Sequence, residues 1–135
     1  MARSLSSEIS LHAQQVLLVA GLTDRAPLKT ALAREGWTCI EASEGDMVEK
    51  LLPMIRIHLI AMDLELPRLD PLPLLRRLRA APASAKIPIV VLAKVGGAGP
   101  AAIEAGADAF LVKPVAPGDL VRAVSRHLTS VFRAP

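Results

Sequence analysis

The stretch HLIAMD at residues 58–63 decides the fold of this chain. An apolar run this short, followed by the turn-forming LELP at residues 64–67, predicts a strand that is buried on both faces. The strand ends in Asp63, and in open α/β sheets the carboxyl ends of the strands border the crevice where ligands bind. Position alone leaves two interpretations of Asp63 open: a reactive group at a site, or a capping residue of the following loop.

Four more apolar segments of strand length surround this one. The predicted strands cover residues 15–20, 37–42, 58–63, 87–93 and 109–112. Helical spacing after each of them predicts helices that begin near residues 24, 44, 71, 101 and 117. Strands that alternate with helices indicate a parallel sheet covered on both faces. We therefore predict an α/β fold, a flavodoxin-like doubly wound five-stranded parallel sheet in the order 2-1-3-4-5, with five helices, the fourth shortened.

Length and composition indicate one globular domain. With 135 residues and 52% apolar residues, the chain is long enough to bury a core. We expect residues 1–13, which are Ser-rich, to form a flexible arm and residues 14–135 to form a single domain, with no output domain. No apolar run is long enough for a membrane span, and no apolar stretch near the start resembles a signal peptide. The lone Cys39 cannot form an intramolecular disulfide, so we expect a buried structural thiol and a cytoplasmic protein.

The net charge of +3 raises the question of nucleic-acid binding. Only 2% of the residues are aromatic and none is tyrosine, so stacking platforms for single strands are almost excluded. The basic residues are spread out except for Arg76, Arg77 and Arg79, which we expect on the solvated face of one amphipathic helix. We predict no nucleic-acid partner and no membrane partner.

Parallel strands bring their carboxyl ends to one edge of the sheet. The residues expected there are Ala20 and Gly21, Ala42 and Ser43, Asp63, Ala93 and Lys94, and Lys113. Asp63 is the lone carboxylate of this set, and the fold places it near Lys113. The ammonium group would keep the Asp63 carboxyl ionised.

Several motifs around these residues are similar to those of the receiver domain of two-component response regulators. They are VLLV at 16–19, MDLELPRLD at 62–70, IPIVVL at 87–92 and EAGADAFLVKP at 104–114. The resemblance covers about residues 15–130 with nearly the spacing of the family. It implies that Asp63 is the phosphate acceptor, that Lys113 holds the phosphoryl oxygens, and that Pro114 follows a cis peptide bond. Phe110 would occupy the place of the aromatic switch residue.

Three features depart from the family pattern. Ala20 and Gly21 stand where the family has an acidic pair that binds Mg²⁺ with the acceptor, and Ala93 stands where it has a Thr or Ser that bonds the phosphoryl group. The stretch between the fourth strand and Lys113 is about two residues short. A complete site of three carboxylates and one lysine carries roughly −2, whereas Asp63 and Lys113 sum to about zero, so we predict that Mg²⁺ binding is lost and that no cofactor is bound.

Two other carboxylates could replace the missing ligands of the site. Asp24 follows the first strand and could supply a metal ligand, although Thr23 and Asp24 are more typical of a helix N-cap. Glu65 is expected at the rim of the pocket, where it could provide a second carboxylate or pair with Lys94 or Lys113. The Gly-rich run at 96–99 could cradle an anion, but a flexible loop explains it better. The three histidines are scattered and predict no metal site.

We interpret the chain as an atypical receiver domain, not an enzyme, that signals through protein–protein contacts independently of phosphorylation. A receiver that accepts a phosphoryl group on Asp63 is the alternative, and a small-ligand module of flavodoxin type is a further one. Expected partners are a histidine kinase, an output protein or a second copy of the chain. The expected interaction face is an apolar patch at Ile103 and Phe110, rimmed by Arg122 and Arg126. The alternative is that both arginines are merely solvated and contact no partner.

Overall fold

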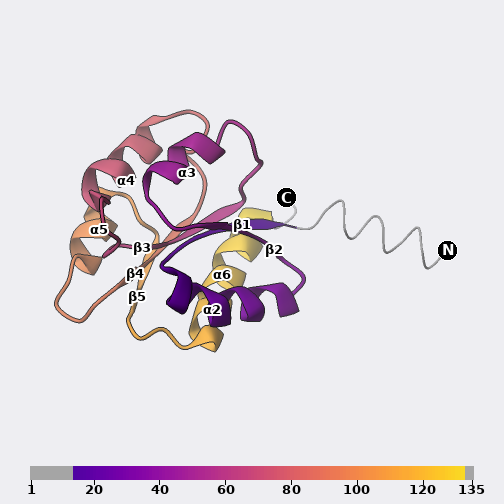
Figure 1. Ribbon diagram of the computed structural model, residues 1–135. Coiled ribbons are helices and arrows are strands. Elements are labelled where there is room, and N and C mark those ends of the chain that lie inside the picture. Colours follow the sequence, from indigo (N-terminus) through magenta and orange to yellow (C-terminus); the bar gives the residue numbers. More distant parts are fainter. Residues whose placement is uncertain (1–13, 133–135) are drawn as a thin grey trace.

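The computed structural model describes residues 14–132, so the N-terminal arm expected over residues 1–13 lies outside the described residues. Within the described part of the chain, five strands alternate with five helices (Figure 1). In chain order they are β1 (Gln15–Val19), α2 (Leu22–Arg34), β2 (Thr38–Ala42), α3 (Asp46–Leu51), β3 (Leu59–Asp63), α4 (Pro71–Ala80), β4 (Ile89–Ala93), α5 (Gly99–Ala105), β5 (Ala109–Val112) and α6 (Pro117–Phe132).

The strands form one parallel sheet in the order β2-β1-β3-β4-β5, which confirms the predicted topology. The register places Asp63 opposite Leu92 and Ala93 opposite Val112. Because neighbouring strands end almost level, the residues that follow β3, β4 and β5 meet at one edge of the sheet. This edge holds the candidate site.

Helices cover both faces of the sheet, α3, α4 and α5 on one side and α2 and α6 on the other (Figure 1). Each face has its own apolar core, because successive strand residues point to opposite sides. In β3, Ile60 and Met62 belong to the core beneath α4, whereas Leu59 and Ala61 belong to the core beneath α2 and α6. Every residue of β3 is buried, so the prediction of a strand buried on both faces is confirmed. None of the described helices is both long enough and apolar enough to span a membrane.

Three helix starts lie two residues from the predicted positions, those of α2 (Leu22), α3 (Asp46) and α5 (Gly99). The N-cap position of α2 is Gly21, so Asp24 lies in the first turn of the helix and the N-cap interpretation of Asp24 was wrong. Helix α5 begins at Gly99 rather than at 101, because Pro100 fits the first turn of a helix, where its missing N–H needs no partner. The predicted end of α2 is confirmed, since Gly36 follows the C-cap Glu35 with a positive φ of 88°.

The three arginines of α4 do not form one solvated face. Arg77 is exposed and pairs with Glu49 of α3 at 2.9 Å between Nη2 and Oε1. The side chain of Arg79, by contrast, is only 23% exposed and donates to backbone carbonyls of the turns before β4 and β5. The prediction was wrong for Arg79 because the turn that follows α4 folds back over this side chain.

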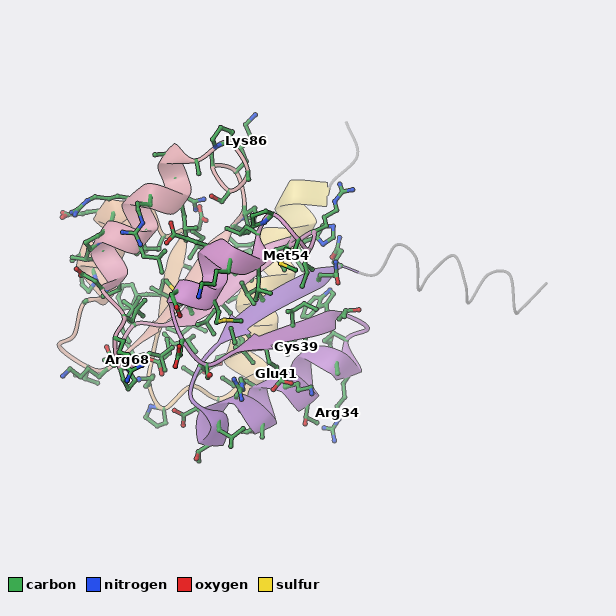
Figure 2. The ribbon with its side chains drawn as sticks, turned by 45° about the horizontal axis from the view of Figure 1, so that its top comes forward. Arg34, Cys39, Glu41, Met54, Arg68 and Lys86 are labelled. Carbon is green, nitrogen blue, oxygen red and sulfur yellow. The ribbon has the colours of Figure 1, made fainter. Side chains whose placement is uncertain are left out.

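A small ion cluster joins the edge strand β2 to α2, and Figure 2 labels its carboxylate, Glu41. Glu41 accepts from Lys29 at 2.7 Å and lies 3.2 Å from the guanidinium Nε of Arg25. Cys39 of the same strand is half-buried rather than fully buried as expected. Burial, with a smaller contribution from the charge of Glu41, raises the pKa of the Cys39 thiol to about 11. At neutral pH the thiol is therefore protonated, which is typical of an unreactive cysteine.

Candidate functional site

Asp63 ends β3 at the carboxyl edge of the sheet, and its side chain is only 5% exposed. Both carboxylate oxygens accept from the Lys113 ammonium, at 2.9 Å for Oδ1 and 3.0 Å for Oδ2. Oδ1 also accepts from the backbone N–H of Glu65 at 2.8 Å. The buried charge of Asp63 is therefore balanced by one cation and one backbone dipole.

Lys113 follows β5 and bridges two carboxylates. Its Nζ lies 2.8 Å from Oε1 of Glu65 in addition to its bonds to Asp63. Burial lowers the pKa of the Lys113 ammonium, but the hydrogen bonds to Glu65 and Asp63 outweigh it, so the net pKa lies above its usual value. The backbone N–H of Lys113 donates to the carbonyl of Ala93 at 2.9 Å, which joins the ends of β4 and β5.

Glu65 links the loop after β3 to the loop after β4. Its Oε1 and Oε2 lie 3.0 and 3.2 Å from the backbone N of Lys94, which donates to the carboxylate. The sequence left open whether Glu65 pairs with Lys94 or Lys113. In the structure Glu65 binds the ammonium of Lys113 and the backbone N–H of Lys94, whose own side chain takes no part.

A cavity of about 460 Å³ opens above Asp63 and Lys113. The residues that line it with this pair come from the first turns of α2, from β4, from the loop before α6 and from the first position of α6: Thr23, Asp24, Pro27, Leu28, Leu92, Pro114, Val115 and Pro117. Asp24 is thus brought into the same cavity as Asp63, and its alternative role as a ligand in the site stays a prediction.

The positions that depart from the family pattern offer no side-chain oxygen to the site. Ala20, which follows β1, and Ala93, which ends β4, are buried, and Gly21 is the N-cap residue of α2. Among the described residues, no group of three or more histidine, cysteine, aspartate or glutamate side chains lies close enough together to hold a metal ion. His58 lies at the opposite end of β3, where its Nδ1 accepts from the backbone N–H of Gln15.

The loop that leads from β3 to α4 turns at Arg68, which has a positive φ of 62° (Figure 2). A non-glycine residue in this region carries a strain of roughly 1 kcal/mol. No sequence signal marks this position, because arginine has no preference for left-handed backbone.

The peptide bond between Lys113 and Pro114 is cis. Just before it, Phe110 of β5 is 37% exposed and packs against the first residue of α5, where a Cβ on Gly99 would lie 2.6 Å from the phenyl Cδ1. Ile103 on α5 is 39% exposed, and Val112 on β5, which the sequence analysis missed, is 47% exposed. Phe110 and Val112 lie on the edge strand β5 and Ile103 lies on the neighbouring helix α5, and these three side chains are called here the β5 patch.

Arg122 and Arg126 are exposed on α6, which covers the other face of the sheet from α5. Arg122 donates to Asp119 one turn earlier on its own helix. Among the described hydrogen bonds and ion pairs, none joins either arginine to α5 or β5. The structure therefore places the β5 patch and the arginines on elements that flank the same edge strand.

Comparison with known proteins identifies the class of protein. The model of the response regulator receiver domain family matches residues 23–125, and the chain belongs to this family. Receiver domains are signalling modules of two-component systems, where they interact with histidine kinases and output proteins. The order of the strands and the lysine beside the buried aspartate agree with this assignment.

Among the relatives, a gliding motility regulatory protein of Myxococcus xanthus is 32% identical over 116 residues, which are 84% of this chain and 15% of that protein. The cyclic di-GMP phosphodiesterase response regulator RpfG of Xanthomonas campestris is 42% identical over 67 residues, 48% of this chain and 18% of RpfG. The chain spans about half or less of the length of the curated relatives it matches.

Solved receiver structures superpose closely on the fold. A putative response regulator from Chloroflexus aurantiacus has a TM-score of 0.81 at 28% identity, covering 87% of this chain and 98% of the other. The receiver domain of a sensor histidine kinase from Pseudomonas aeruginosa, described with a magnesium ion in its active site cleft, has a TM-score of 0.77 at 25% identity. That match covers 86% of this chain and 98% of the other.

Proposed function

We propose that this receiver domain transmits signals through protein–protein contacts without Mg²⁺ and without phosphorylation of Asp63. The observation that carries the proposal is the direct bond between the Lys113 ammonium and both carboxylate oxygens of Asp63. The ammonium withdraws charge from both carboxylate oxygens, which makes Asp63 a weaker nucleophile toward a phosphoryl group.

The donor set around Asp63 does not fit Mg²⁺, the ion described in the Pseudomonas aeruginosa receiver. Mg²⁺ requires near-octahedral oxygen ligands and gives up water reluctantly. Ala20 and Gly21 provide no carboxylate, and the Glu65 carboxylate is held by Lys113 and the Lys94 N–H. The phosphoryl group would also lack stabilisation of its developing charge, and Ala93 has no hydroxyl group to follow it.

We expect the phosphoryl analogue beryllofluoride, added with Mg²⁺, to leave the protein unchanged. In ¹⁵N–¹H correlation spectra, the amides of Asp63, Ala93 and Phe110 should shift no more in wild type than in Asp63→Asn. Saturable shifts that reach Phe110 in wild type and vanish in Asp63→Asn would overturn the proposal.

A phosphorylated receiver is the second candidate function, and one observation favours it. Asp24 lines the same cavity as Asp63, so a change of its rotamer could bring a second carboxylate toward the site. The same spectra recorded during a Mg²⁺ titration discriminate between the functions. Saturable binding in wild type that is lost in both Asp24→Asn and Asp63→Asn would favour this candidate over the first.

For the protein contact we propose the β5 edge, with the apolar patch at Ile103 and Phe110 and with Arg122 and Arg126 of α6 as polar rim. Both apolar side chains are more than a third exposed, and apolar patches with arginine nearby are typical of interfaces. A second copy of the chain is the partner that can be tested directly. Binding at this edge would leave Asp63 untouched.

Replacing both Arg122 and Arg126 with alanine is expected to weaken self-association by about tenfold or more, because arginines often dominate interface energy. Analytical ultracentrifugation over a concentration series measures the dissociation constant. Arg76→Ala, an exposed arginine on α4, is the matched control. The opposite result would be weaker association in Asp63→Asn and wild-type association in the double arginine variant. It would show that association depends on the Asp63 site and not on the arginines of α6.

A further inference from the structure

We propose that Glu65 is a built-in anionic ligand that fills an oxyanion-binding position formed by the Lys113 ammonium and the Lys94 backbone N–H. The ligand class of this position is a tetrahedral oxyanion of the size of phosphate. The inference goes beyond the proposed function, because it concerns reversible anion binding and not the chemistry of Asp63.

The two donors come from neighbouring strands and converge on one carboxylate. Lys94 and Lys113 are the first residues after β4 and β5, and the Lys113 N–H to Ala93 carbonyl bond holds these strand ends together. Oε1 of Glu65 lies 2.8 Å from Nζ of Lys113 and accepts from the backbone N–H of Lys94 at 3.0 Å. A backbone N–H beside an ammonium is an arrangement that suits an oxyanion.

The loop after β4 closes tightly over the carboxylate. The N–H of Gly97 donates to the carbonyl of Lys94 at 2.9 Å. A Cβ on Gly97 would lie 3.2 Å from Oε2 of Glu65 and 2.9 Å from Cγ of Lys94. A side chain at position 97 would press on the side chain and backbone carbonyl of Lys94, so glycine favours the close turn that lies beside the Glu65 carboxylate.

Charge explains why the carboxylate excludes other anions. Asp63, Glu65 and Lys113 together carry a net charge of about −1, so an entering phosphate is repelled and also finds both donors engaged. Without the Glu65 carboxylate, the pair of Asp63 and Lys113 is neutral, and the Lys94 N–H and the part of the Lys113 ammonium not bonded to Asp63 lose their acceptor. Glu65 therefore acts as an intramolecular competitor.

The same loop leads to the β5 patch. It runs from Lys94 to Gly99, where the Phe110 ring packs against the backbone. Removing the carboxylate frees the loop at one end, and the Phe110 environment should respond. A change in the position of the Glu65 side chain is therefore expected to alter the β5 patch at the edge of the sheet.

The test titrates inorganic phosphate into wild type, Glu65→Ala and Glu65→Gln, with chloride at matched ionic strength as the blank. The primary readout is the chemical shift of the Lys94 amide in ¹⁵N–¹H correlation spectra. The chemical shift of the Phe110 amide is the second readout. We expect saturable binding to Glu65→Ala at least about tenfold tighter than to wild type, because a charge-assisted competitor has been removed. Glu65→Gln, which keeps the side-chain volume without the charge, should lie between them.

Asp24→Asn is the matched control, because Asp24 lines the same cavity but holds neither donor. It should bind phosphate as weakly as wild type. Equal phosphate binding by wild type and both Glu65 variants would overturn the proposal, and so would equal gains in Asp24→Asn and Glu65→Gln. Neither result would bear on whether Asp63 is phosphorylated, which the beryllofluoride spectra decide.

Discussion

Replacing Lys113 with methionine is expected to lower the free energy of unfolding by about 3 kcal/mol or more, the cost of leaving a buried charge without its partner. The Asp63 side chain is 5% exposed and would keep one hydrogen bond, from the backbone N–H of Glu65. Methionine retains the unbranched aliphatic chain, so little packing is lost. Urea unfolding followed by circular dichroism measures the change.

Two further variants isolate the charge of Asp63 as the cause. Lys94→Met removes a lysine from the same edge, but its side chain is exposed and bonds to none of the described residues, so stability should change by less than about 0.5 kcal/mol. Asp63→Asn combined with Lys113→Met should recover about half of the loss, because a buried amide carries no charge. A loss in Lys113→Met no greater than in Lys94→Met would contradict the prediction.

Alkaline unfolding experiments give an independent readout of the Lys113 bridge. The pKa of Lys113 is raised in the folded protein by Glu65 and Asp63 against the opposing effect of burial. A raised pKa means that the stabilisation is fully present below the unfolded value near 10.5 and is lost as pH rises through the folded value. The difference in stability between wild type and Lys113→Met should therefore be constant up to about pH 10 and narrow above it.

The fold and the central pair of the site could be predicted because they depend on regular features of the sequence. Alternating strands and helices leave few topologies, and parallel strands must end at one edge. Asp63 and Lys113 are 50 positions apart. Asp63 ends β3 and Lys113 follows β5, so the topology of the sheet was enough to predict that they lie close together. The end of α2 at Gly36 was predictable for a similar reason, since glycine suits the left-handed residue there.

The rest of the site depends on loop paths and side-chain rotamers, which leave no periodic signal. Glu65 was expected at the rim of the pocket, but its bond to the Lys94 N–H depends on the paths of the loops after β3 and β4. Asp24 was taken for an N-cap because its residue type is common there, whereas the α2 helix begins two residues earlier. Arg79 looked like part of a solvated charge run because helical spacing cannot show what the following turn covers.

Because the turn after α4 covers its side chain, Arg79 is the second residue whose replacement should lower the stability strongly. Its guanidinium donates to the carbonyls of Gly106 and Ile87, both at 2.7 Å, and to that of Ala85 at 3.2 Å. It also binds Asp108 at 2.7 Å, and the same Asp108 oxygen accepts from the Ile89 N–H. One side chain thus ties the end of α4 to the turns that begin β4 and β5.

Arg79→Ala is expected to lower the free energy of unfolding by about 2 kcal/mol, because several half-buried acceptors lose their donor at once. Arg79→Lys should recover little of the loss, since one ammonium cannot reproduce the planar fork that binds carbonyls on different segments. Arg77→Ala is the matched control on the same helix. Its ion pair with Glu49 is exposed to solvent, so Arg77→Ala should leave the stability almost unchanged.

Arg79→Ala should also disturb the candidate site at the far end of the strands, because β4 and β5 carry Ala93 and Lys113 to the edge where Asp63 lies. Hydrogen exchange measured on the folded protein should speed up at the Ile89 and Lys113 amides, which bond to Asp108 and to Ala93. Wild-type exchange at both amides in Arg79→Ala, or equal stability of the Arg79→Lys variant and wild type, would show that the fork contributes nothing beyond its charge. The expected result makes Arg79 a positioning residue, one that acts on the Asp63–Lys113 pair through the start of the strands that carry it.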